Sequence, residues 1–364
     1  MAPIEGPRGV DLGVPARKGA ELAIHEINRG GGLRVDDRQV LVELRVEDCG
    51  DHPEAVIEAT RRLITNQSVV GLVGPILSRN ALVAATVAEH HRVPMITPSA
   101  TAPEVTRGRE FVFRATFVDD QQGRALARFT RHHLELHRAA VLYDVASPHQ
   151  RTVAETFRAA FDALGGTTVA FESHTTGERD FEAQLLRIRD AQPEILLLPN
   201  YLEEVPMQVE QARRLGIEAT LLGSDAWSGD SYPSLPGFEG AYFADEWQVG
   251  VPESTSEPSN EFEQRFFDNH GEAPMSLAAA SYDATRLLLS ALAEAGTLDG
   301  EAIRQSLLDL PPFEGVTGTM DFVHHGDPRK NIFIYRIVEG RIVLEAVMEP
   351  EGSAPPGPAT ASDS

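Results

Sequence analysis

Two short segments of the chain place hydroxyl residues directly after apolar, strand-like runs. Residues 69–73 are followed by Gly74-Pro75-Ile76-Leu77-Ser78, and residues 93–96 by Thr97-Pro98-Ser99-Ala100-Thr101. The start of a helix or turn offers free backbone N–H groups, and a neighbouring hydroxyl adds a further donor, so each segment can hold a carboxylate. Together the two segments predict an anion site.

A third segment ends another buried-strand pattern with a carboxylate. It reads Leu221-Leu222-Gly223-Ser224-Asp225-Ala226-Trp227, and the natural partner of Asp225 is a cation. Anion donors in one half of the chain and a carboxylate in the other are suited to clamp a zwitterion, such as an α-amino acid, between two lobes. Each feature also has a simpler interpretation: Ser78 as a helix N-cap, Asp225 as a turn carboxylate, and Trp227 as core instead of pocket wall.

Composition limits the class of protein. A chain of 364 residues with 42% hydrophobic and 24% charged residues suits two globular domains. The formal net charge of −23 repels nucleic acid and anionic lipid, so we expect neither as a partner. The longest apolar-rich stretch, near 276–282, is far too short to span a bilayer.

Motifs of common enzymes and metal sites are missing from the sequence. It contains no Gly-x-Ser-x-Gly elbow, no phosphate-loop Gly-Lys-Ser/Thr and no Gly-x-Gly-x-x-Gly, which argues against an enzyme. Its single cysteine, Cys49, excludes an intramolecular disulfide and is expected to be a small buried residue. His133 and His137 have the i,i+4 spacing of zinc ligands, but a solvated helix face explains them better. We expect no metal and no cofactor.

The pattern of apolar residues predicts alternating strands and helices. Such alternation indicates α/β lobes with parallel-sheet cores, and ligands of such sheets bind beyond the carboxyl ends of the strands. The last two strands flank the turn Glu339-Gly340 and are expected to be antiparallel. Helices are predicted over 16–28, from 53 onward, and over 79–90, 121–132, 153–164, 181–190, 204–215, 261–269, 277–294 and 301–308, with strands over 40–46, 69–73, 94–96, 139–143, 167–171, 194–198, 220–223, 241–246, 332–338 and 341–347.

The two ends of the chain differ from the rest. The first seven residues lack the basic and apolar regions of a secretory signal, and a helical pattern begins near Pro15 with almost nothing before it. Either a leader has been removed from this chain, or the start lies within the first strand. The first case predicts a periplasmic or extracytoplasmic location, and a genuine start predicts a cytoplasmic one. Residues 350–364 are expected to form a disordered tail.

In its order of motifs the chain resembles the type I periplasmic binding proteins, and within them the branched-chain amino acid (Leu/Ile/Val) group that feeds ABC importers. The resemblance spans nearly the whole sequence, and the motifs, individually weak, are specific in this order. They are Gly19-Ala20-Glu21-Leu22-Ala23, Glu26-Ile27-Asn28, Glu47-Asp48, Gly74-Pro75 through Ser78, residues 97–101, Phe113-Arg114-Ala115-Thr116, Asp119-Asp120-Gln121-Gln122-Gly123, Val141-Leu142-Tyr143-Asp144, Gln211-Ala212-Arg213-Arg214-Leu215-Gly216 and Gly223-Ser224-Asp225.

The resemblance implies a role for individual residues. Ser78 and Thr101 would hold the ligand carboxylate, Ser99 would offer its carbonyl to the ammonium, and Asp225 would pair with that ammonium. Ala100 is placed beside them, Tyr201 after the long second-lobe strand, and Asp119 near the hinge. One departure concerns the loop after Asp144, where relatives commonly carry a tyrosine. This chain has Pro148-His149-Gln150 there, so His149 replaces that ring or the loop closes differently.

The resemblance also implies an architecture and a function. We expect two Rossmann-like lobes joined by a hinge that the chain crosses several times, with residues 1–118 and 243–322 in lobe 1 and 119–242 and 323–349 in lobe 2. The expected function is non-catalytic capture of a zwitterion for an ABC permease, with membrane contact only through that permease or a missing lipid anchor. Two alternatives remain: a ligand-sensing module of a regulator or receptor, and a binder of urea, amides or aromatic acids.

Overall fold

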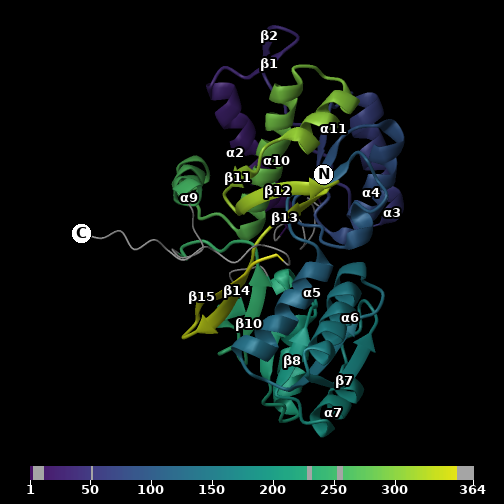
Figure 1. Cartoon of the computed structure of the whole chain (residues 1–364), viewed down its shortest axis with the longest axis vertical. Helices are drawn as coiled ribbons and strands as arrows, with labels where there is room; N and C mark the ends of the chain where they lie inside the picture. The colour runs from purple at the N-terminus through teal and green to yellow at the C-terminus, as the bar shows by residue number, and fades with distance from the viewer. Residues whose placement is uncertain (3–11, 51, 228–231, 252–256, 351–364) are drawn as a thin grey trace, which may run out of the picture.

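A seven-stranded sheet forms the centre of one lobe (Figure 1). The computed structural model describes residues 1–2, 12–50, 52–227, 232–251 and 257–350. Strands β7, β6, β8, β9 and β10 pair in parallel, and β14 and β15 extend the sheet in antiparallel. The strands, in sheet order, are β15 (Arg341–Met348), β14 (Ile332–Val338), β10 (Tyr242–Asp245), β9 (Thr220–Gly223), β8 (Ile195–Leu198), β6 (Arg138–Asp144) and β7 (Thr167–His174).

Helices cover both faces of this sheet. Since successive strand residues point to opposite faces, each strand contributes side chains to two apolar cores. Along β6, Ala140 and Leu142 join the apolar core under two helices, while Val141 and Tyr143 join the core under two others. A strand buried on both faces is apolar throughout, as β8 is. The first pair of helices is α7 (Glu182–Asp190) and α8 (Val205–Arg214), and the second is α5 (Asp119–Arg128) and α6 (Pro148–Ala163).

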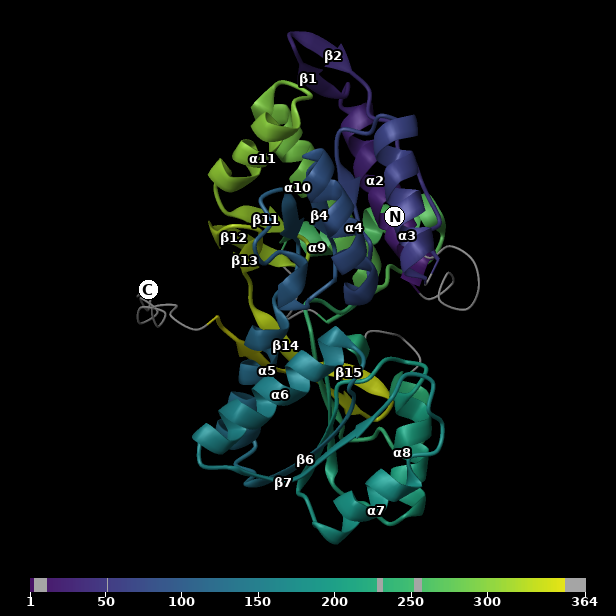
Figure 2. The ribbon, with the colours of Figure 1, turned by 90° about the vertical axis from the view of Figure 1, so that its right-hand side faces the viewer.

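The other lobe contains a short parallel sheet, an antiparallel sheet and several helices (Figure 2). α2 and α10 pack so closely that a Cβ on Gly19 would lie 2.0 Å from the Ala278 carbonyl oxygen. The strands are β3 (Leu72–Val73), β4 (Met95–Thr97) and β5 (Val112–Arg114), then β11 (Phe313–Gly315), β12 (Gly318–His324) and β13 (Asp327–Arg329), and a hairpin of β1 (Leu33–Val35) and β2 (Arg38–Val40). The helices are α2 (Val14–Arg29), α3 (Pro53–Arg61), α4 (Ser78–His91), α9 (Glu257–His270), α10 (Ser276–Ala295) and α11 (Gly300–Asp309).

The predicted α/β fold is confirmed, and most elements lie within a few residues of their expected positions. One predicted strand, over 40–46, was wrong: within the described part of the chain, residues 41–47 pair with no other strand. The Asn28 side chain instead accepts from the Val42 N–H and donates to its carbonyl, at 2.9 and 2.8 Å. β1, β5 and the sheet of β11, β12 and β13 were not predicted. Four of these five strands span only three residues, which carry too little periodicity to recognise.

Within the described residues, the polypeptide passes between the lobes three times. We call the lobe that contains β3, β4 and β5 the first lobe and the lobe that contains the seven-stranded sheet the second lobe. Ala115 packs in a core of the first lobe and Phe117 in a core of the second, so the first crossing lies between them. The second follows β10, and the third lies just before Ile332. The expected boundary at 242/243 falls inside β10, all of which pairs in the seven-stranded sheet, and 322/323 falls inside β12. We therefore propose lobe boundaries near 116, 246 and 330.

Two further expectations concern the ends of the chain and the membrane. The predicted disordered tail lies outside the described residues, except for Pro350. Among the helices that the structure describes, none combines the length and the hydropathy that a membrane span requires.

Candidate functional site

Ser78 and Thr101 lie in one lobe, just beyond the carboxyl ends of β3 and β4. Ser78 is the first residue of α4, and the N-cap is Leu77, so the simpler interpretation of Ser78 as a cap is wrong. The Ser78 Oγ accepts the Ala102 N–H at 3.2 Å, which leaves its own proton available for another acceptor. Ser78 is 3% exposed and Thr101 1%.

Arg114 holds the loop that carries Thr101. Its guanidinium donates to the carbonyls of Ala100 and Ala102 at 2.8 and 3.0 Å, on either side of Thr101. A third contact, to Asp327 at 2.6 Å, ties the guanidinium to β13. Arginine suits this task because its planar fork presents several donors in fixed directions. The Thr101 side chain is therefore aimed by a buried cation rather than by the loop alone.

Ser99 and Ala100 bond within their own segment. The Ser99 hydroxyl donates to the Ile76 carbonyl at 3.2 Å, and the Ala100 N–H donates to the Thr97 hydroxyl at 3.1 Å. These bonds fix the loop, and the predicted ligand contacts of the two residues stay predictions.

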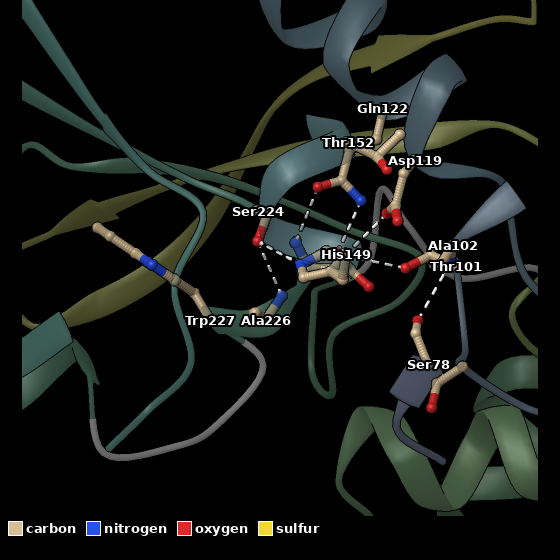
Figure 3. Close-up of polar contacts among 12 residues, drawn as sticks. Ser78, Thr101, Ala102, Asp119, Gln122, His149, Thr152, Ser224, Ala226 and Trp227 are labelled. Atoms are coloured by element: carbon tan, nitrogen blue, oxygen red, sulfur yellow. Dashed lines mark hydrogen bonds and ion pairs between the residues drawn. The ribbon is translucent and has the colours of Figure 1, made fainter. Parts of the chain in front are cut away.

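His149 lies at the centre of the site, between the two lobes (Figure 3). It is the second residue of α6 and is 2% exposed. Its Nδ1 lies 2.8 Å from Asp119 Oδ1 and 3.0 Å from Thr101 Oγ1. Its Nε2 lies 3.2 Å from Ser224 Oγ and 3.7 Å from Asp225 Oδ1. His149 thus connects a hydroxyl of the first lobe to two carboxylates that the second lobe contributes.

The contacts of His149 indicate that the ring is charged. A carboxylate only accepts, so the nitrogen facing Asp119 must carry a proton, and the nitrogen facing Ser224 and Asp225 is placed to donate as well. Burial lowers the pKa of His149, but the charges of Asp119 and Asp225 and the bond to Asp119 outweigh it and raise that pKa to about 9. Because a cation is disfavoured at a helix N-terminus, the two acids are needed to stabilise it.

Asp225 lies at the start of the turn after β9, and its side chain is 17% exposed. Gln122 binds it twice: its amide donates to Asp225 Oδ1 at 2.7 Å and accepts the Asp225 N–H at 3.3 Å. Burial raises the pKa of Asp225, an effect that the His149 charge partly offsets. With two carboxylates and one imidazolium, the cluster carries a formal charge of minus one.

Two aromatic residues differ in their relation to the site. Tyr201 stacks on His149, with ring centroids 5.6 Å apart and an interplanar angle of 29°, so it borders the cluster. Trp227 points away from it (Figure 3). It is 1% exposed, stacks on Tyr232 and donates to the Leu198 carbonyl at 3.0 Å. Trp227 is therefore a core residue and not a pocket wall.

Asp119, His149 and Asp225 also form a group of residue types that can ligate a metal ion. The two carboxylates face different nitrogens of one ring, at 2.8 and 3.7 Å. A single ion could therefore reach only one imidazole nitrogen unless the ring turned. The arrangement is that of a cation bridging two acids, which does not suit a bound metal.

Sequence reasoning missed three residues of the site. Arg114 and Gln122 were noted only as parts of motifs, and Ser224 only as the residue before Asp225. Gln122 follows Asp119 by three residues, the spacing that places two side chains on one helix face, and this signal could have identified it. Arg114 gave no such signal, because its partners are backbone carbonyls and the Asp327 side chain, 213 residues away in the chain.

The comparisons with known proteins concern the family and the fold of the chain. A family profile described as "Periplasmic binding protein" matches residues 1–341. The chain belongs to this family. The Leu/Ile/Val-binding protein homolog 3 of Brucella melitensis is 27% identical to this periplasmic binding protein over 348 residues, which are 94% of this chain and 91% of the relative.

Solved structures confirm the type I fold and the branched-chain amino acid group. The leucine-binding protein LivK of Thermotoga maritima has a TM-score of 0.86 and 27% identity, covering 96% of this periplasmic binding protein and 97% of LivK. LivJ of Streptococcus pneumoniae, solved in complex with isoleucine, has a TM-score of 0.84, 27% identity and coverage of 96% and 97%. A solute-binding protein of Rhodopseudomonas palustris, solved with 3,4-dihydroxybenzoic acid, shares the fold at TM-score 0.82, 21% identity and coverage of 96% and 96%.

Proposed function

We propose that this chain captures an amino acid between its two lobes and delivers it to an ABC importer outside the cytoplasm. The names of relatives that share about a quarter of its residues support transport-linked binding of a small solute. The predicted ligand residues support the zwitterion, since they lie on both lobes and carry the charges that an amino acid would need.

The observation that carries the proposal is the second oxygen of Asp119. Asp119 is 0% exposed, and its Oδ2 has no hydrogen-bond partner among the described residues. A buried carboxylate oxygen without a partner costs free energy, so it calls for a donor. A ligand ammonium supplies such donors, and it also neutralises the negative charge of the cluster of Asp119, His149 and Asp225.

Two hydroxyls would receive the carboxylate of the same ligand. Because the protonated Nδ1 of His149 cannot accept a hydrogen bond, the Thr101 hydroxyl beside it is left to donate its proton elsewhere. The Ser78 hydroxyl proton is likewise left to donate, because its oxygen accepts from Ala102. Bonds from such donors to a carboxylate contribute about 1.5–3 kcal/mol each.

Capture would also add a second link between the lobes. In the structure the Thr101 hydroxyl of one lobe meets His149 of the other at 3.0 Å. A ligand held by Thr101 on one side and by Asp225 on the other would strengthen this link, so the closed form would be stabilised by the ligand that bridges the lobes.

A thermal-shift scan tests the proposal. The purified protein is scanned against the twenty amino acids, urea, small amides and benzoate, and we expect at least one L-amino acid to raise its melting temperature by several degrees at saturation. Stabilisation by benzoate or amides alone would contradict the role proposed for Asp119 and Asp225, and no shift with any compound would contradict amino acid capture.

A further inference from the structure

The sequence uses lysine at only two positions. Of its 32 basic residues, Lys18 and Lys330 are the lysines and the other 30 are arginines. Lys18 pairs with Glu272 at the surface, at 2.5 Å. Lys330 is 2% exposed. In a chain that otherwise uses arginine, a lysine at a buried position indicates a need for a compact ammonium.

The ammonium of Lys330 has one acceptor for each of its three protons. It donates to the Ala115 carbonyl at 2.9 Å, to Glu246 Oε2 at 2.6 Å and to Thr317 Oγ1 at 2.5 Å. Three acceptors around one point suit the three rotatable donors of an ammonium and not the planar fork of a guanidinium. The acceptors are themselves buried, with Ala115 at 0%, Glu246 at 4% and Thr317 at 1% exposure.

Two of the three acceptors, and Lys330 itself, lie at the crossings between the lobes. Ala115 precedes the first crossing, Glu246 follows β10 at the second, and Lys330 itself lies at the third. At the first two crossings the core of one lobe ends and that of the other begins within three residues, between Ala115 and Phe117 and between Ala244 and Trp247. All three connections therefore converge on a single ammonium.

A second carboxylate completes the arrangement from the first lobe. Asp283 of α10 accepts the Thr317 hydroxyl at 2.7 Å and the backbone N–H groups of Thr317 and Val316 at 2.8 Å. Because the Thr317 hydroxyl donates to Asp283, its oxygen remains to accept from Lys330. Burial raises the pKa of Glu246 and that of Asp283, and the Lys330 charge offsets only part of each increase.

We infer that Lys330 is a positioning residue that fixes the pivot of the two lobes by holding the three crossings together. The consequence for affinity rests on the proposed function, since closure around a ligand needs a hinge with a defined axis. Without the ammonium the crossings would move independently, and ligand binding would have to order them at a cost in affinity.

Hydrogen exchange on the ligand-free protein tests the clamp itself. In Lys330→Met we expect backbone amides at all three crossings, near 115–118, 245–248 and 329–332, to exchange at least tenfold faster, while the amides of β6 and β8 keep their rates. Lys18→Met is the matched control and should leave every segment unchanged. Faster exchange near 330 alone, or equally throughout both lobes, would overturn the inference.

Two further variants keep the test decisive. Lys330→Arg retains the charge but not the geometry, so the crossings should still exchange faster, and wild-type exchange in this variant would overturn the requirement for an ammonium. If Lys330→Met does not fold, Glu246→Gln is measured in its place. It removes the charge of one acceptor, and a smaller acceleration at the same three crossings is expected, whereas unchanged exchange would contradict the clamp.

Calorimetry tests the consequence for binding, with the amino acid that gives the largest thermal shift. Well below the melting temperature of each variant, Lys330→Met should raise the Kd at least tenfold and Lys18→Met should not change it. A purely structural role would lower the melting temperature but leave this Kd unchanged, and that result would overturn the positioning role. Exchange needs no ligand, so failure of the proposed function would leave the test of the clamp intact.

Discussion

Among the buried cations that the structure describes, Lys330 and His149 each have two carboxylates nearby, and their hydrogen bonding differs. Lys330 satisfies all three of its donors with Ala115, Glu246 and Thr317. His149 bridges Asp119 and Asp225, but one contact is 3.7 Å long and Asp119 Oδ2 has no hydrogen-bond partner within the described chain. The cluster of Lys330, Glu246, Thr317 and Asp283 is saturated, because every ammonium donor has an acceptor, and it suits a part of the molecule that stays fixed. The cluster of Asp119, His149 and Asp225 is unsaturated, and it suits a part that exchanges partners with a ligand.

The largest effect should come from breaking the saturated cluster. Lys330→Met leaves Glu246 buried without its counter-charge, and removing one partner of a buried ion pair typically costs about 3–5 kcal/mol. We expect urea unfolding to show a loss of that size, while Lys18→Met, which breaks a surface pair, changes stability by less than about 1 kcal/mol. Equal small losses in both variants would show that the saturated cluster contributes little.

The second effect concerns pH and the charge on His149. Its pKa is raised in the folded state to about 9, so the stabilisation from its charge is fully present below about pH 6.5 and is lost as the pH rises through 9. The unfolding free energy of the wild type should exceed that of His149→Gln by about 2–3 kcal/mol at pH 6. This difference should shrink toward pH 10, and a constant difference would exclude titration of His149 as its source.

The third effect concerns Asp225, the carboxylate that faces Nε2 of His149. Asp225→Asn removes the charge proposed to face the ligand ammonium but keeps an acceptor for Gln122, so amino acid affinity should fall at least tenfold. Because burial already raises the pKa of Asp225, the loss of its charge should lower the melting temperature of the empty protein less than His149→Gln does. Asp120→Asn, which alters a neighbouring acid of α5 outside the cluster, is the control, and calorimetry measures both. Unchanged affinity in Asp225→Asn would remove Asp225 from the site.

The smallest effect should come from a single hydroxyl. Thr101→Val keeps the shape of the side chain but loses the donor for the ligand carboxylate and the acceptor for His149. We expect a rise in Kd of about tenfold, consistent with the lower end of the range of about 1.5–3 kcal/mol for a hydrogen bond to a charged group, and Thr101→Ser should retain most of the affinity. If serine and valine at this position gave the same Kd, the hydroxyl would have no part in binding.

The sequence was more informative about strand ends than about what surrounds them. Ser78, Thr101 and Asp225 could be placed because each follows a buried run, and the order of α/β elements then directs them to one edge. The same reasoning could not decide whether His149 replaces the tyrosine that relatives carry after Asp144 or whether the loop closes differently. That depended on Asp119, which lies 30 residues away in the chain and bonds to it at 2.8 Å.

Long-range polar contacts explain the rest of what was missed. Lys330 gave no local signal, because its partners Ala115 and Glu246 lie 215 and 84 residues away. Periodicity reports which face of an element is buried, but it carries no information on which buried donor meets which acceptor. For the same reason Trp227 could not be assigned to core or pocket before its contacts with Tyr232 and Leu198 were seen.

The most direct test of the central claim compares two ligands that differ only at the ammonium. Calorimetry is run on the wild-type protein with the amino acid that the thermal scan ranks first, and with the α-keto acid of the same side chain. If Asp119 Oδ2 and Asp225 receive an ammonium, the keto acid should bind at least a hundredfold more weakly. Equal affinity for the two compounds would show that the unsaturated cluster does not receive an ammonium and would contradict the account.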